Sequence, residues 1–181
     1  MDDLLEICIM IDEEGVHMLA ELKPLLEMLD AFFEEAKEML DGLNIDQLNW
    51  RPISGDDSGE ATNSLYGLAL HISFVAMRGA ANAARRIMPE YPEMNLGNSG
   101  VNARGESAER AIQILNEAQL FVRDVLFHLT PEQLEELRER RVGNWAGEPK
   151  SVRWMMLHIL EHTALHIGHM ELTRQLLVKQ A

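Results

Sequence analysis

Apolar residues recur at helical spacing along nearly the whole chain, and no segment shows the alternation typical of a half-buried strand. This spacing predicts four long helices, at about 15–40, 63–88, 107–129 and 152–178. Pro24 is expected to kink the first helix near its start. The periodicity therefore favours an all-α protein.

Residues that begin helices or form loops mark the boundaries between these segments. Asn63 or Ser64 can cap the second helix and Ser107 the third, and "TPEQLEEL" predicts a short helix capped by Thr130. Two long connections, at about 41–62 and 89–106, are rich in Gly, Pro, Asp and Asn. Four amphipathic helices with long connections predict a four-helix bundle, which we expect to form a single domain over residues 1–181.

Composition narrows the functional classes. The net charge of −14 repels phosphate backbones and anionic lipid, so we expect neither a nucleic-acid partner nor a membrane partner. The single cysteine, Cys8, supplies no thiolate cluster for zinc. No segment resembles a signal peptide or a membrane span, so the expected location is cytoplasmic.

The stretch "HILEHTALHIGH" at 158–169 carries the candidate chemistry. It holds four of the seven histidines: His158, His162, His166 and His169. On a helix these four share one stripe about 80° wide. Leu165, Leu172 and Leu176 lie in or beside that stripe, so we expect it to face the core. A lone histidine there would most often be a hydrogen-bonded core residue, but each further buried imidazole needs its own partner.

Metal ligation would satisfy several imidazoles together. All four cannot share one ion, because His158 and His169 are about 16 Å apart along a helix axis. One adjacent pair must therefore supply two ligands to the ion, either 158/162, 162/166 or 166/169. Spacing alone does not choose between these three pairs. His71, on an apolar face of the second predicted helix, is the candidate third ligand. Three histidines leave one tetrahedral position open, which is the catalytic arrangement.

Other residues of the last predicted helix have more than one interpretation. Glu161 lies near the edge of the histidine stripe, where it could orient an imidazole, act as a base or be an ordinary surface charge. Trp154 is expected in the core, and His17 and His128 are expected to be structural or surface residues. The helix is apolar nearly all round, which favours a homodimer.

Three blocks of the sequence carry a family resemblance: "NWRP" at 49–52, "NSLYGLALH" at 63–71 and "SVRWMMLHILEHTALHIGHMELTRQ" at 151–175. They resemble the DinB/YfiT-like superfamily of metal-dependent enzymes, near its mycothiol-dependent branch. The resemblance implies a four-helix bundle with a metal triad at His71, His162 and His166. It also implies that His158 and His169 are supporting or pocket residues. His169, and Glu161 from its place beside the histidine stripe, are the catalytic candidates. The narrower branch often carries glutamate at the position of His162.

The resemblance also implies a type of reaction. Three imidazoles suit several divalent ions, and we expect zinc or nickel. The implied function is a thiol-dependent S-transferase or isomerase that acts on small electrophiles, with mycothiol, bacillithiol or glutathione as cosubstrate. One alternative is a metal-dependent hydrolase that uses a metal-bound water, and the other is a non-catalytic stress-related binding bundle.

Overall fold

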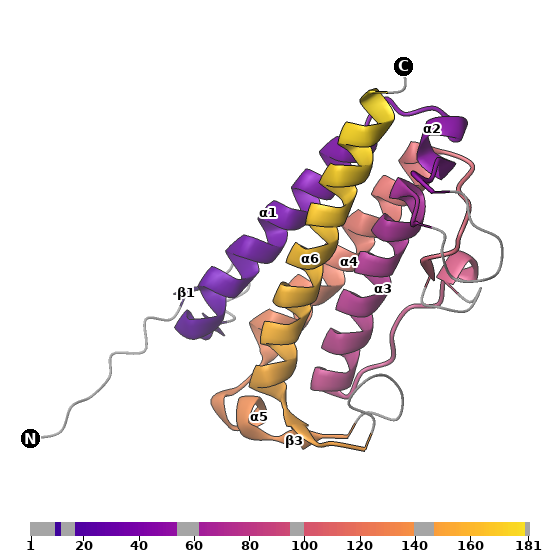
Figure 1. Cartoon of the computed structure of the whole chain (residues 1–181). Coiled ribbons are helices and arrows are strands. Elements are labelled where there is room, and N and C mark those ends of the chain that lie inside the picture. The colour runs from indigo at the N-terminus through magenta and orange to yellow at the C-terminus, as the bar shows by residue number, and fades with distance from the viewer. Residues whose placement is uncertain (1–9, 12–16, 54–61, 95–99, 140–146, 180–181) are drawn as a thin grey trace, which may run out of the picture.

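The computed structural model describes residues 10–11, 17–53, 62–94, 100–139 and 147–179, and four long helices dominate it (Figure 1). These are α1 Lys23–Leu40, α3 Leu65–Ala84, α4 Ala108–His128 and α6 Val152–Val178. They pack as a four-helix bundle, which confirms the predicted all-α class. Within the described ranges, no helix combines the length and apolarity that crossing a membrane requires.

Several short elements join the helices. They are β1 Met10–Ile11, β2 His17–Met18, the 3₁₀ turns Ala20–Leu22 and Pro92–Met94, α2 Ile45–Asn49, α5 Pro131–Glu135, β3 Leu137–Arg138 and β4 Lys150–Ser151. β1 pairs with β2 and β3 with β4, both antiparallel. The sequence did not predict α2 or these ladders, because strands of two residues are too short to show alternation.

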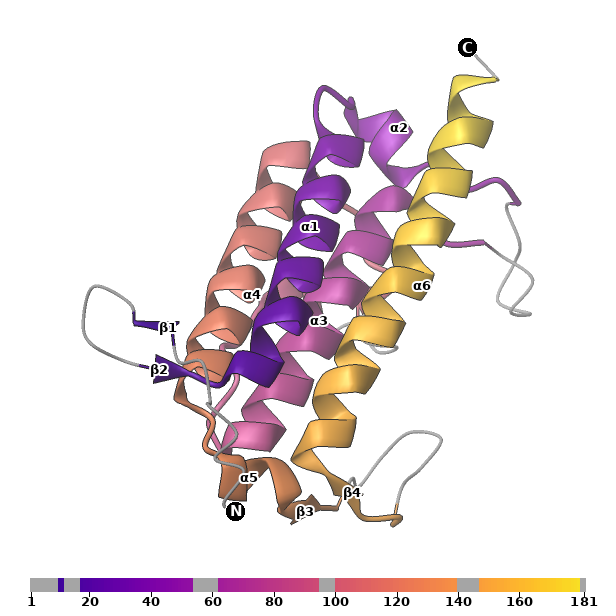
Figure 2. The same ribbon diagram turned by 90° about the vertical axis from the view of Figure 1, so that its left-hand side faces the viewer.

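The order of packing places α3 beside α6. α3 packs against α4 and α6, and α1 packs against the same two helices, so α1 and α3 lie on opposite corners. Figures 1 and 2 show that α1 and α6 run toward one end of the bundle, whereas α3 and α4 run toward the other. Residues on facing sides of α3 and α6 can therefore share one groove.

The long connection before α4 returns the chain to the end where α3 begins. Asn49 accepts a hydrogen bond from the Gly105 N–H at 2.9 Å and donates one to the Gly105 carbonyl at 2.8 Å. Gly67 in the first turn of α3 permits the Val101 carbonyl to approach, since a Cβ at this position would collide with it. These contacts attach 100–105 to α2 and α3 and allow α4 to run parallel to α3.

Capping side chains explain most helix boundaries. Two boundaries differ from the predicted ones. Side-chain oxygens of five residues accept hydrogen bonds from backbone N–H groups at helix starts: Asn44, Ser64, Ser107, Thr130 and Ser151. The first helix begins at Lys23 rather than near 15, because Pro24 occupies the first turn, where its missing N–H costs nothing. α3 ends at Ala84 rather than near 88, because Arg85 adopts a left-handed conformation with φ of 54°.

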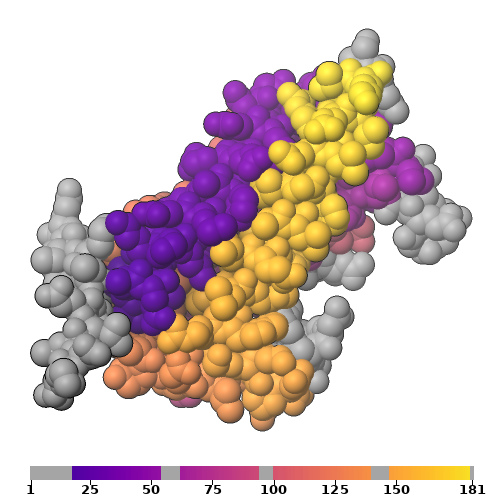
Figure 3. Space-filling view, turned by 60° about the vertical axis from the view of Figure 1, so that its left-hand side comes forward, coloured from indigo at the N-terminus to yellow at the C-terminus, as the bar shows by residue number. Residues whose placement is uncertain are grey.

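The buried face of α6 differs from the predicted one. Its core residues are Val152, Met156, Ile159, Thr163, Ile167, Met170, Thr173 and Leu177. Leu165 and Leu172 are instead 53% and 56% exposed, and Leu176 is also exposed. The histidine stripe therefore lies on a flank of α6, between the core row and an outer leucine row. Figure 3 shows the outer surface of α6 beside α1.

Candidate metal centre

Three histidines from two helices converge in the groove between α3 and α6. His71 extends from α3, and His162 and His166 extend from adjacent turns of α6. One ring nitrogen from each lies within 4.8 Å of the other two, and all three residues are half-buried. The Nε2 atoms of His71 and His162 are 3.3 Å apart. In the described part of the chain, no other group of three metal-binding side chains clusters in this way.

The spacing of these nitrogens fits a small divalent ion. Zinc–nitrogen bonds of about 2.0–2.1 Å at tetrahedral angles separate two ligand nitrogens by about 3.3 Å. The His71 and His162 nitrogens already stand at this separation. The ring centroids of His162 and His166 are 4.4 Å apart, and the His166 ligand nitrogen lies within 4.8 Å of the other two. The donor set and its geometry therefore fit a metal site.

His166 is held in the protonation state that a ligand needs. Burial, and then the nearby His71 and His169 imidazoles, lower the pKa of His166 from 6.5 to about 4. Its ring is therefore neutral at neutral pH, which keeps a nitrogen lone pair available.

The two outer histidines support this group from either side. His169 Nδ1 lies 3.2 Å from His166 Nδ1, and a hydrogen bond there would leave Nε2 of His166 available as the ligand atom. On the other side, the His158 ring centroid lies 5.8 Å from that of His162. Of the three pairs left open by spacing, the structure groups 162/166 with His71.

Glu161 contacts an outer histidine rather than the central three. Its carboxylate lies 3.0 Å from His158 Nδ1, and its side chain is 71% exposed. Its catalytic role, like that of His169, stays a prediction. His128, at the end of α4, is exposed as expected, whereas the side chain of His17 lies outside the described residues.

Two pockets adjoin the outer histidines, one on each side of the centre, and a tryptophan lines each. The Trp154 pocket has a volume of about 280 Å³ and reaches His158, and the Trp50 pocket has a volume of about 540 Å³ and reaches His169. Trp154 is 36% exposed and stacks on His158, so its predicted core position was wrong. A signal for this was present in the sequence, because Trp154 stands four residues before His158 in the same helical row.

Comparison with known proteins agrees with the fold. The profile of the mycothiol-S-transferase family matches residues 24–178. A conserved protein from Enterococcus faecalis superposes with a TM-score of 0.70 at 15% identity, over 87% of this chain and 97% of that one. A DinB-like protein from Bacillus cereus superposes with a TM-score of 0.59 at 18% identity, over 85% and 91%. No curated protein sequence matches the chain.

Proposed function

Because the chain belongs to the mycothiol-S-transferase family, we propose that it is a metal-dependent enzyme that transfers a low-molecular-weight thiol to a small electrophile. The observation that carries this proposal is the convergence of three imidazole nitrogens within 4.8 Å beside two pockets. Two pockets suit a reaction that brings together two small molecules.

Each histidine of the groove has a distinct role in this proposal. His71, His162 and His166 would hold a divalent ion, zinc or nickel by the chemistry of the donors. When bound, such an ion supplies positive charge that lowers the pKa of a coordinated thiol. His169 orients His166 through the bond between their Nδ1 atoms. Glu161 holds His158, which lies between the central group and the Trp154 pocket.

The proposed reaction forms one bond to sulfur and breaks one bond to a leaving group. The thiol loses its proton to solvent or a nearby base, and the sulfur attacks the electrophilic carbon. The leaving group departs with its bonding electron pair, so the products are a thioether and the leaving anion. No oxidant or reductant is required.

Thiol consumption tests this proposal. Protein loaded with zinc or nickel is mixed with 1-chloro-2,4-dinitrobenzene and one thiol. Separate assays use mycothiol, bacillithiol and glutathione as that thiol. We expect one thiol to accept one dinitrophenyl group and release one chloride ion, faster than in the uncatalysed mixture. His71→Ala should reduce the rate to background, while His128→Ala, at an exposed helix end, should keep it. Background rates with all three thiols and a panel of other electrophiles would contradict the proposal.

A further inference from the structure

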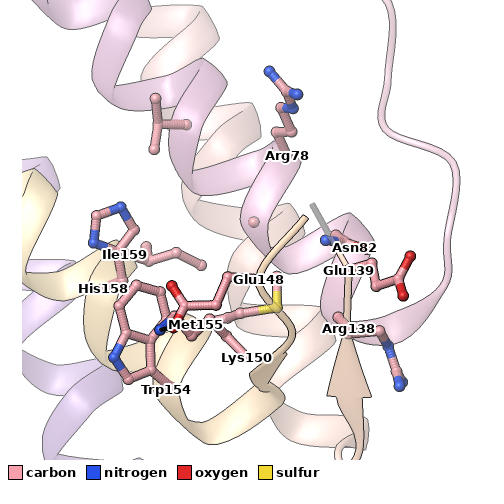
Figure 4. A pocket seen from close by; sticks show the side chains of 12 residues that line it. Arg78, Asn82, Arg138, Glu139, Glu148, Lys150, Trp154, Met155, His158 and Ile159 are labelled. Carbon is pink, nitrogen blue, oxygen red and sulfur yellow. Dashed lines mark ion pairs between the residues drawn. The ribbon is translucent and has the colours of Figure 1, made fainter. Parts of the chain in front are cut away.

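The apolar wall of the Trp154 pocket is formed by Val75 of α3 and by Trp154, Met155 and Ile159 of α6, while most of its other lining residues are charged or polar. Val75, Gly79 and Asn82 line it from α3, and Trp154, Met155 and Ile159 line it from α6. Figure 4 shows the three α6 side chains gathered on one side of the pocket, opposite α3. Its volume of about 280 Å³ is at the lower end for ligand sites, which suits a molecule of one or two rings.

The charged residues around this pocket are paired or point away from it. Lys150 Nζ lies 2.9 Å from Glu148 Oε1. Arg138 is buried and donates to Glu136 at 2.7 Å, and its guanidinium extends away from Trp154 (Figure 4). The pocket therefore has little attraction for an ionic ligand from these groups.

Two further charged residues stand on the rim. The Arg78 guanidinium extends away from Trp154 along α3, and the Glu139 carboxylate also points outward (Figure 4). Arg78 lies 5.7 Å from the Phe74 ring centroid, which accounts for its position. Because neither charge faces the interior, burying an ionic group there would cost more than burying a neutral one.

Neighbouring side chains hold the Trp154 indole in place. It stacks on the His158 imidazole with 5.2 Å between ring centroids and 11° between planes, and Lys150 Nζ lies 5.3 Å from its ring centroid. A fixed aromatic wall loses little freedom when a ligand binds. The Met155 thioether and the Ile159 side chain add adaptable apolar surface, which favours contact with a flat ring.

The pocket lies next to the metal centre. His158 lines the pocket, and its ring centroid is 5.8 Å from that of His162. None of the three grouped histidines lines the pocket, so a ligand that packs on Trp154 and Ile159 would contact the centre through His158. The Trp50 pocket, on the His169 side, would remain for a second molecule.

We propose that the Trp154 pocket is the subsite for the electrophilic substrate, and that it selects an uncharged, flat apolar molecule of one or two rings. The assignment of this ligand as a substrate rests on the proposed function. The binding itself does not, because it needs neither a metal nor a thiol.

Equilibrium binding of a neutral probe tests the pocket directly. The full chain is treated with chelator, and binding of 1-naphthalenemethanol is measured by equilibrium dialysis without any thiol. We expect saturable binding of about one probe per chain, and weaker binding of the anionic analogue 1-naphthoate. Trp154→Leu should raise the Kd at least about tenfold. Trp50→Leu, the matched change in the other pocket, should leave the Kd unchanged.

A second variant covers the case in which Trp154→Leu fails to fold. Val75→Phe fills the pocket from α3 at a half-exposed position and should weaken binding similarly. The proposal is overturned by the absence of saturable binding, by unchanged affinity in folded pocket variants, or by an equal loss in Trp50→Leu.

Separate thiol assays distinguish the two proposals. Probe binding at Trp154 without thiol consumption would retain the pocket and remove the transferase. Thiol consumption by the wild-type protein, together with unchanged probe binding in Trp154→Leu, would retain the transferase and remove the pocket.

Discussion

His166 is kept neutral first by its burial in the groove and then by the two imidazoles beside it, which together lower its pKa. Protonating it would place a positive charge close to His71 and His169, with little water to stabilise that charge. The same crowding that disfavours a proton favours a divalent ion, because an ion is bound by all the lone pairs together. The His71 imidazole therefore contributes both to the low pKa of His166 and to the proposed metal site.

This environment predicts how the metal-free protein responds to acid. The unfolded chain binds a proton at this residue near the ordinary pKa of about 6.5, but the folded chain does so only near pH 4. Stability contributed by neutral His166 is therefore complete above pH 6.5 and is lost as the pH falls toward 4. In chelator-treated protein, NMR titration should show the ring signals of His166 moving near pH 4. Signals that move near pH 6.5 would contradict this prediction.

For single residues, the sequence predicted that histidines would be the metal ligands better than it predicted which histidines lie together. The histidine spacing excluded one ion shared by all four residues, but it left three pairs open. The choice of His162 and His166 depends on how far α6 is shifted along α3, because this shift sets which turn lies opposite His71. A helical wheel contains no such information, and the family resemblance supplied it.

Among the elements, the helices with strong capping residues were the most predictable. α4 and α6 begin and end within about one residue of their predicted bounds, because Ser107 and Ser151 cap them and their apolar spacing is regular. Which apolar row of α6 is buried, and therefore where the histidine stripe lies, was not predictable from the sequence. Both its core row and its outer leucine row are apolar, and only packing against α1 and α3 decides which row is buried.

Two helix glycines offer a matched test of the contacts between elements. Gly67 is buried with the Val101 carbonyl against it, whereas a Cβ at Gly168 on α6 would meet nothing within 4 Å. Gly67→Ala should therefore destabilise the protein by about 1–3 kcal/mol. Gly168→Ala should stabilise it by about 0.5–1 kcal/mol, because alanine loses less backbone entropy in a helix. Urea unfolding measures both changes, and equal effects at the two positions would contradict the described attachment of 100–105 to α3.

For the whole molecule, the outer leucine row of α6 is an exposed apolar surface. Leu157, Leu165 and Leu172 are each more than half exposed along one helix, in a chain whose charge of −14 would otherwise keep molecules apart. We propose that this row contacts the same row of a second copy.

Sedimentation tests this association. At micromolar concentration the protein should sediment at twice the chain mass of 20.5 kDa. Leu165→Glu should sediment as a single chain, because it would place a charge in an apolar contact. Leu120→Glu, at a similarly exposed leucine on α4, should leave the association intact. A wild-type protein found only as single chains would remove the proposal.

The central claim concerns the whole centre, which exists only when α3 and α6 are packed together. The most direct measurement is metal content by mass spectrometry, on protein purified without chelator or affinity tag, beside His71→Ala and His166→Ala variants. We predict about one zinc or nickel ion per wild-type chain, and loss of that ion in both variants. A wild-type chain without metal, or metal retained in both variants, would contradict the claim that His71, His162 and His166 form one site.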